Sequence, residues 1–152
     1  GMFPAAGRIR KPYTGRQSAM HVQPCYCEEC RPPRTSGIRI IACGGRDFDD
    51  WVAVCRALDL LDSRSPIGLL IHGDAPGADR TAADWAMKHR VPIKCYPADW
   101  GKHGRRAGPL RNAQMLTELP DGVVAFPGGG RGTADMCRQA EAAGVRVWRP
   151  FG

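Results

Sequence analysis

The sequence predicts a three-layer α/β fold around a doubly wound, mainly parallel sheet of five strands. From residue 38 onward, short apolar runs alternate with segments of helical periodicity, at about 25–30 residues per unit. Such alternation implies right-handed βαβ crossovers and therefore parallel strands. The first two runs also lack polar alternation, which is typical of strands covered on both faces. The 152 residues suffice for one such domain with a short extension.

The first half of this region predicts three strands and two helices. Residues 38–43 form a β-branched run that ends at a glycine pair, the pattern of a strand followed by a tight turn. Asp49 or Asp50 can cap the helix that follows, and Trp85 is expected to face the interior from a second helix over residues 78–90. The strands are expected at residues 38–43, 67–72 and 91–96.

The second half predicts two more strands and two helices. A polar, glycine-rich connection over residues 99–108 leads into a helix near residues 109–119, where Pro109 suits the first turn. A further helix over residues 133–143 is closed by Gly144. The last two strands are expected at residues 123–126 and 145–148.

Three glycine-rich, polar loops are expected beyond the carboxyl ends of the strands, where doubly wound sheets bind their ligands. Each loop precedes a helix, so free backbone N–H groups and the positive ends of helix dipoles point into one crevice. This arrangement favours an anion, and phosphate is the usual one. The candidate ligand-binding residues of these loops are Gly44, Gly45, Arg46, Asp47, Gly73, Asp74, Gly77, Asp79, Gly128, Gly129, Gly130, Arg131, Gly132 and Thr133.

The loop over residues 127–133 is the most specific of the three, because four glycines in five positions let the backbone approach a ligand closely. Thr133 can cap the next helix and contact a phosphate. The loop is neither a Walker A sequence nor a GxGxxG fingerprint, and a turn that serves only geometry is the alternative. Asp74 or Asp79 can bind ribose hydroxyls, although either can equally cap a helix. His72 is expected to be a hydrogen-bonded strand end rather than a base.

A cluster of cations precedes the fourth strand. Trp100 offers a face on which a base can stack, and arginine forks suit phosphate. The alternative interpretation is a solvated basic loop. Asn112 is unfavourable inside a helix, so its amide is expected to read a polar group of the ligand. The cations, which fall within ten residues, are Lys102, His103, Arg105, Arg106 and Arg111.

The net charge of +7 is unevenly distributed, and the sequence pI is near 9.3. Residues 1–37 hold six Lys and Arg against two Glu, with repeated Pro and few aliphatic side chains. They are expected to form a basic arm that does not fold alone, ahead of a domain over residues 38–152. No apolar run approaches the roughly 18–20 residues that a membrane span needs, and no secretory stretch occurs at the N-terminus. We therefore expect a cytoplasmic protein without membrane contact.

Three of the seven cysteines lie in the arm, at Cys25, Cys27 and Cys30, with His21 four residues upstream. Three thiolates and an imidazole can make a tetrahedral zinc site. The spacing is not a common paired-knuckle pattern, and a mobile tail with free or oxidised thiols is the alternative. The other four cysteines fall inside apolar segments, where a thiol behaves as a small hydrophobe.

A resemblance to a known family rests on five segments, at residues 43–47, 72–79, 97–100, 107–112 and 126–136. In this order they resemble the YspA, cpYpsA-related branch of the SLOG superfamily. That superfamily takes its name from the Smf/DprA DNA-processing proteins and the Lonely-guy (LOG) phosphoribohydrolases. The resemblance implies a Rossmann-like fold, a nucleotide or nucleotide-derived ligand in the crevice, and association into homo-oligomers.

The chain departs from the LOG pattern at one informative position. LOG enzymes cleave nucleoside monophosphates to free base and ribose 5-phosphate, and Met136 stands where they carry the catalytic Glu. An N-glycosidic hydrolase would therefore need Asp74 or Asp135 as its carboxylate. Residues 73–86 also resemble a segment of the DNA-processing proteins, and this resemblance implies single-stranded nucleic acid as a further candidate ligand. The leading expectation is binding of a nucleotide or its derivative by a sensor or processing protein, with hydrolysis and nucleic-acid binding as the alternatives.

Overall fold

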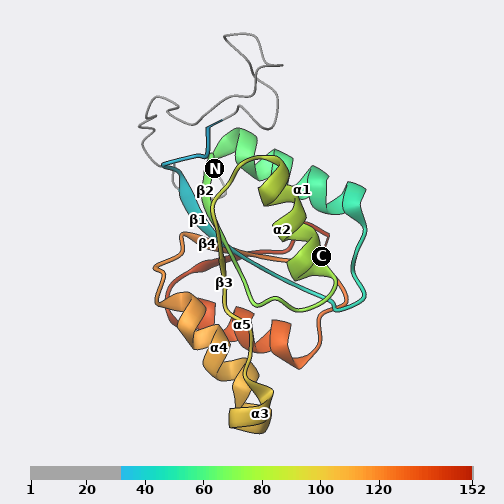
Figure 1. The fold of residues 1–152 in the computed structure, drawn as a ribbon, viewed down its shortest axis with the longest axis vertical. Coiled ribbons are helices and arrows are strands. Elements are labelled where there is room, and N and C mark those ends of the chain that lie inside the picture. The colour runs from blue at the N-terminus through green and yellow to red at the C-terminus, as the bar shows by residue number, and fades with distance from the viewer. Residues whose placement is uncertain (1–31, 152) are drawn as a thin grey trace, which may run out of the picture.

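The computed structural model describes residues 32–151 and contains a five-stranded sheet with helices on both faces (Figure 1). The strand order is β3-β2-β1-β4-β5, and every neighbouring pair is parallel. This confirms the predicted Rossmann-like, doubly wound α/β fold. The strands are β1 (Ile38–Cys43), β2 (Ile67–His72), β3 (Ile93–Cys95), β4 (Gly122–Ala125) and β5 (Arg146–Trp148).

Two helical layers cover the sheet. α1 and α2 pack on one face, while α4 and α5 pack on the other, and the short α3 and 3₁₀ helix η1 extend beyond the second layer (Figure 1). The helices are α1 (Trp51–Arg64), α2 (Ala78–Lys88), α3 (Trp100–His103), η1 (Gly104–Arg106), α4 (Ala107–Leu116) and α5 (Arg131–Ala142).

From Ile40 to Cys43 the apolar run of β1 is continuous because both faces of the strand are buried there, whereas Arg39 near its start is exposed. Ile40 and Ala42 belong to the core beneath α1 and α2, which Trp85 also joins. The alternate residues Ile41 and Cys43 belong to the core beneath α4 and α5. Successive side chains of a strand point to opposite faces, so a central strand needs apolar residues at every position that the two helical layers cover.

The segment over residues 99–108 differs from the expected irregular connection, because most of it is helical. The Asp99 carboxylate accepts the N–H of Lys102 and thereby caps α3. Ala107 and Gly108 are buried at the start of α4. The basic segment is thus helical but exposed, and α4 begins two residues before Pro109.

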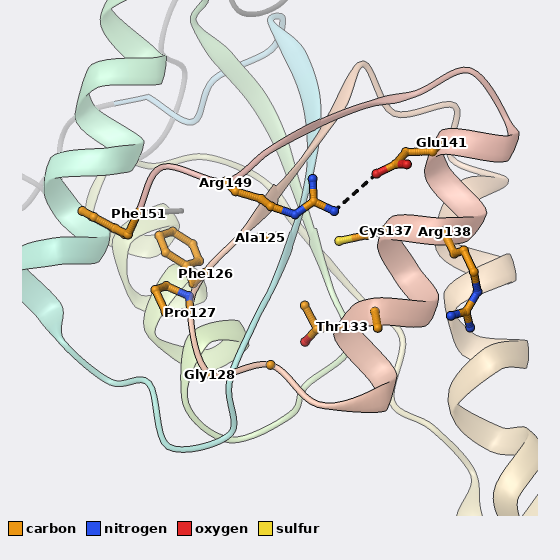
Figure 2. Close-up of a pocket in the computed structure, with 12 residues that line it drawn as sticks. Ala125, Phe126, Pro127, Gly128, Thr133, Cys137, Arg138, Glu141, Arg149 and Phe151 are labelled. Carbon is orange, nitrogen blue, oxygen red and sulfur yellow. Dashed lines mark hydrogen bonds and ion pairs between the residues drawn. The ribbon is translucent and has the colours of Figure 1, made fainter.

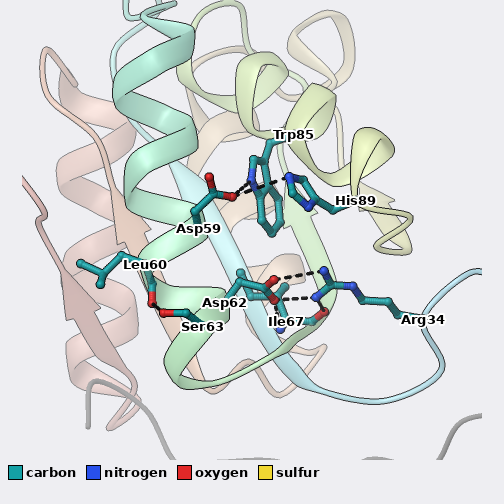
Figure 3. Close-up of polar contacts among 8 residues, drawn as sticks. All are labelled: Arg34, Asp59, Leu60, Asp62, Ser63, Ile67, Trp85 and His89. Carbon is teal, nitrogen blue, oxygen red and sulfur yellow. Dashed lines mark hydrogen bonds and ion pairs between the residues drawn. The ribbon is translucent and has the colours of Figure 1, made fainter. Parts of the chain in front are cut away.

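Arg34, which the sequence assigns to the basic arm, is bonded to the domain (Figure 3). Its guanidinium contacts both carboxylate oxygens of Asp62 and donates to the carbonyl of Ile67 at 3.1 Å. Asp62 also accepts the backbone N–H of Ile67 at 2.9 Å. The chain is thus fastened beside the start of β2 before it enters β1. Within residues 32–151, no helix has the length and apolar character needed to cross a bilayer.

Candidate functional site

A cleft of about 800 Å³ lies beyond the carboxyl ends of β1 and β4. These strands are neighbours, while the chain after β1 continues to β2 on the opposite side, so the cleft is at the topological switch point. Residues from four separate segments line it: the three glycine-rich loops, as expected, and the segment from Trp100 to Met115. The lining residues are Cys43, Gly44, Arg46, Ala75, Asp79, Trp100, Arg105, Gly108, Pro109, Arg111, Asn112, Met115, Gly130, Arg131, Gly132, Thr133, Ala134, Asp135 and Arg138.

The N-terminus of α5 opens into this cleft. Gly130 is the N-cap residue, and the first helical bond runs from the Ala134 N–H to the Gly130 carbonyl at 3.1 Å. The three N–H groups before Ala134 consequently have no acceptor within the helix. Thr133 is not the cap: its hydroxyl donates to the carbonyl of Gly44 at 3.1 Å and joins the β1 loop to the first turn of α5. This end of the helix supplies the expected N–H donors.

Arginines dominate the polar lining of the cleft. Arg111 is the most constrained, because it donates to the Gly73 carbonyl at 2.8 Å and to the Asn112 side-chain oxygen at 2.9 Å. Two of its five N–H donors are used in these bonds, which leaves others for a ligand. The other lining arginines, all exposed to solvent, are Arg46, Arg105, Arg131 and Arg138.

The two aspartates of the second loop have different environments. Asp79 is buried and accepts the N–H groups of Gly73, at 2.9 Å, and Ala75, at 3.4 Å. Burial raises the pKa of Asp79, although these two bonds and the nearby Arg111 oppose that shift. Asp74 is exposed, pairs with Arg80 at 3.4 Å and is not part of the cleft lining. Asp79 therefore holds the loop from within and faces the cleft, whereas Asp74 lies outside the cleft lining.

Asn112 and Asp135 link α4 to α5 at the floor of the cleft. The Asn112 amide donates to the Gly132 carbonyl at 3.1 Å and to the Asp135 carboxylate at 2.9 Å. Asp135 also accepts from Gln139 at 2.7 Å. The amide that was expected to read a ligand is thus used inside the protein. Met136, at the position of the LOG glutamate, is fully buried in the core and cannot contact a ligand.

Several expected ligand residues pack the loops together instead of lining the cleft. The Gly45 N–H donates to the Pro127 carbonyl at 3.0 Å, and the Gly45 carbonyl accepts from Phe48 and Ala78. Gly77 has a φ of +79°, and a Cβ there would lie 2.3 Å from the Gly45 carbonyl oxygen. The remaining residues outside the cleft lining are Asp47, Gly73, Gly128 and Gly129.

A second cavity of about 480 Å³ lies on the other side of the first turn of α5, and Gly128 and Gly129 line it (Figure 2). Cys137 faces this cavity near Arg149, which pairs with Glu141 at 3.3 Å. A hydrogen bond with the Cys43 thiol, assisted by the positive charge of Arg149, lowers the pKa of Cys137 to about 7 despite its burial.

Sequence reasoning did not single out the residues of this second cavity. Cys137 lies in an ordinary helical pattern and Arg149 follows the last strand, so only the fold brings them together. Arg138 was also missed, although it is one turn after Asp135 and pairs with it at 3.3 Å.

The proposed zinc ligands of the arm lie outside the described residues. The four cysteines within residues 32–151 are free, but they do not all behave as buried hydrophobes: Cys43 and Cys137 are buried, Cys55 is half-buried and Cys95 is exposed. Cys95 is exposed because β3 is an edge strand with only β2 beside it.

Comparison with known proteins places the chain in a family. The model of the "YspA, cpYpsA-related SLOG family" matches residues 38–103, from β1 to the end of α3. The chain is also 40% identical over 116 residues to the Gene 61 protein of Mycobacterium phage D29, covering 72% of this chain and 93% of the phage protein. No solved structure matches it. Together with the parallel sheet and its switch-point cleft, these matches show that the chain belongs to the YspA, cpYpsA-related SLOG family.

Proposed function

We propose that the cleft binds a nucleotide or a nucleotide-derived molecule and holds its phosphate at the N-terminus of α5. One observation carries the proposal: five arginines and the open end of a helix converge on a single cleft at the switch point of the sheet. Unpaired N–H groups, a positive helix dipole and guanidinium groups all favour an anion. A volume of about 800 Å³ is in the range of small-molecule sites.

The rest of the ligand has partners of suitable chemistry. Trp100 is 55% exposed at the edge of the cleft and offers a ring face for a base. Asp79 has carboxylate lone pairs beyond those that accept Gly73 and Ala75, so it is the better ribose partner of the two aspartates. Arg46, Arg111 and Arg131 would neutralise the phosphate. A nucleotide ligand and the free thiols of the domain both suit the reducing cytoplasm.

Calorimetry and thermal shift with a panel of nucleotides, ADP-ribose and NAD test this proposal. A ligand that binds the native state raises the melting temperature with concentration. We expect Arg131→Gln to weaken binding of the responding ligand by about tenfold, which corresponds to the loss of one charged hydrogen bond. Arg56→Gln on the exposed face of α1 is the matched control and leaves the affinity unchanged. Responses that stay flat across the whole panel would contradict the proposal.

The exposed basic segment beside Trp100 favours a second candidate, single-stranded nucleic acid. Lys102, His103, Arg105 and Arg106 lie on α3 and η1, and all four are exposed. Binding through phosphate contacts weakens steeply with salt, whereas binding of a mononucleotide in the cleft is much less sensitive. A gel shift that is undetectable, or that does not change with salt, rejects this candidate.

The cleft also contains one of the two carboxylates that an N-glycosidic hydrolase would use. Asp135 lines it, but three side chains already donate to Asp135: Asn112, Arg138 and Gln139. Such a carboxylate is a poor general base, because these three donors occupy most of its roughly four lone-pair sites and stabilise its charge. Prolonged incubation with nucleoside monophosphates, followed by chromatography for free base, decides between binding and hydrolysis. If the wild type releases free base and the Asp135→Asn variant does not, the result would favour the hydrolase.

A further inference from the structure

Three side chains of metal-binding type converge outside the cleft, where β2 and β3 end. They are His72, Asp74 and Cys95, and one potential ligand atom of each lies within 4.8 Å of the others. His72 and Cys95 are register partners at the ends of neighbouring strands. Asp74 lies two residues after His72, in the turn that follows β2, where it has a positive φ of 56°. The sheet register and this turn therefore bring together residues that are far apart in the sequence.

The backbone around the cluster is held in place. The Asp79 carboxylate accepts the N–H groups of Gly73 and Ala75, and Arg111 donates to the Gly73 carbonyl. The Tyr96 N–H donates to the His72 carbonyl at 2.8 Å and continues the β2–β3 pairing beyond Cys95. A fixed backbone limits the rearrangement that a metal ion would require, and this lowers the cost of binding.

We propose that His72, Asp74 and Cys95 bind a divalent transition metal of the zinc type, with a fourth position open to solvent. Imidazole nitrogen, carboxylate oxygen and thiolate sulfur are the three ligand types that zinc takes from proteins. A mixed set with sulfur and nitrogen excludes magnesium and calcium, which prefer oxygen alone. This inference is independent of the nucleotide proposal, since none of the three residues lines the cleft.

The present contacts of the three residues are compatible with metal entry. The Nδ1 atom of His72 accepts the Asp74 N–H at 3.0 Å, and an ion bound at this nitrogen would replace that donor. The Asp74–Arg80 pair is exposed on both sides and is readily exchanged. Bonds of about 2.0–2.3 Å place tetrahedral ligands roughly 3.4–3.7 Å apart. Closure thus needs movements of about 1 Å, which the exposed Asp74 and Cys95 side chains can make by rotation.

Cobalt(II) titration of the full chain tests the site, because a cobalt–thiolate bond produces a charge-transfer band. The arm contains three further cysteines, so the titration is made in a Cys25→Ser/Cys27→Ser/Cys30→Ser background, where any thiolate ligand must come from the domain. We expect one equivalent of cobalt, displaced by zinc, with the thiolate band present. Adding Cys95→Ser should abolish the band and weaken binding by about tenfold or more, since even outer-shell changes cost that much.

Cys55→Ser is the matched control, because Cys55 is a free thiol on α1, a different element from the strands and turn that hold the cluster. It should leave both the band and the stoichiometry unchanged. Asp74→Ala provides a second test at an exposed position and should weaken cobalt binding without removing the thiolate band. Binding of less than one equivalent in the triple-serine background, or binding that Cys95→Ser does not alter, would overturn the proposal and indicate an adventitious ion.

Discussion

The side-chain amide of Asn112 donates a 2.9 Å hydrogen bond to the carboxylate of Asp135, and this bond ties α4 to the N-terminal part of α5. The same amide donates to the Gly132 carbonyl. Asn112 is only 2% exposed, so both bonds are shielded from water. The helix end that points its N–H groups into the cleft is therefore held by a buried side chain of the neighbouring helix.

Asn112→Ala is expected to reduce the free energy of unfolding by about 1–3 kcal/mol, because it removes two hydrogen bonds made by a buried side chain, to the Gly132 carbonyl and to the Asp135 carboxylate. It should also weaken ligand binding at the N-terminus of α5. Denaturant titration and calorimetry measure the two effects. Gln114→Ala, at an exposed position of the same helix, is the control and should change stability by less than about 0.5 kcal/mol. Equal stability of the two variants would show that the Asn112 bonds contribute little.

Gly77→Ala should be strongly destabilising, because the residue has a φ of +79° and its added Cβ would meet two backbone carbonyls, of Gly45 and Arg46. We expect a loss of about 2 kcal/mol or more from the left-handed conformation and the overlap together. In contrast, a Cβ at Gly132 meets nothing within 4 Å, and Gly132→Ala should stabilise α5 by about 0.5–1 kcal/mol. Thermal unfolding measures the change in stability of each variant relative to the wild type. Changes of the same sign in the two variants would contradict the prediction.

Asp79 is expected to make stability depend on pH in a direction opposite to that of an ordinary salt-bridged aspartate. Burial raises its pKa above the usual value of 3.8, so in the range just above 3.8 the native state binds more protons than the unfolded state. The contribution of Asp79 is then fully present below pH 3.8 and is lost as the pH rises through its native pKa.

The comparison with Asp79→Asn isolates this contribution from those of the other carboxylates. The difference in unfolding free energy, wild type minus variant, should fall as the pH rises through the range just above 3.8. Denaturant titrations at several pH values measure it. A difference that rises with pH in this range would mean that the hydrogen bonds from Gly73 and Ala75 outweigh burial.

Cys137 should react with alkylating reagents in a pH-dependent manner, half-maximally at a pH of about 7, because only the thiolate is nucleophilic. Cys55, whose pKa is raised by burial, serves as the reference and should react only at higher pH. Peptide mass spectrometry after timed labelling resolves the two sites. Arg149→Gln removes a positive charge near Cys137 and should shift its reactivity to higher pH. An unshifted profile would exclude Arg149 as a cause.

The elements could be predicted from the sequence because each has a local signal. The five strands follow apolar runs and the main helices follow their apolar periodicity, with Asp50 as the cap of α1, and each of these elements agrees with the structure to within a few residues. The failure at residues 99–108 has a local cause too. Glycine and polar residues suggested a loop, but the Asp99 cap and the burial of Ala107 and Gly108 against the domain favour helix.

The sites were less predictable, because burial and pairing redirect individual side chains. Asn112 was expected to face a ligand, and the neighbouring α5 takes its amide instead. Gly45 was expected to hold phosphate, and the carbonyl of Pro127 takes its N–H. Cys95 was expected to be buried, and the edge position of β3 exposes it. In each case the outcome depends on a residue distant in the sequence.

By itself, the sequence determined the alternation of strands and helices, the parallel sheet, the family and the position of the glycine-rich loops. Hydrophobic periodicity and turn residues act over a few neighbours and are therefore visible in one chain. Only the tertiary structure decided which loop residues line the cleft, which aspartate faces it, and that His72, Asp74 and Cys95 converge. Those results depend on strand order, register and helix packing, which join residues that no local pattern connects.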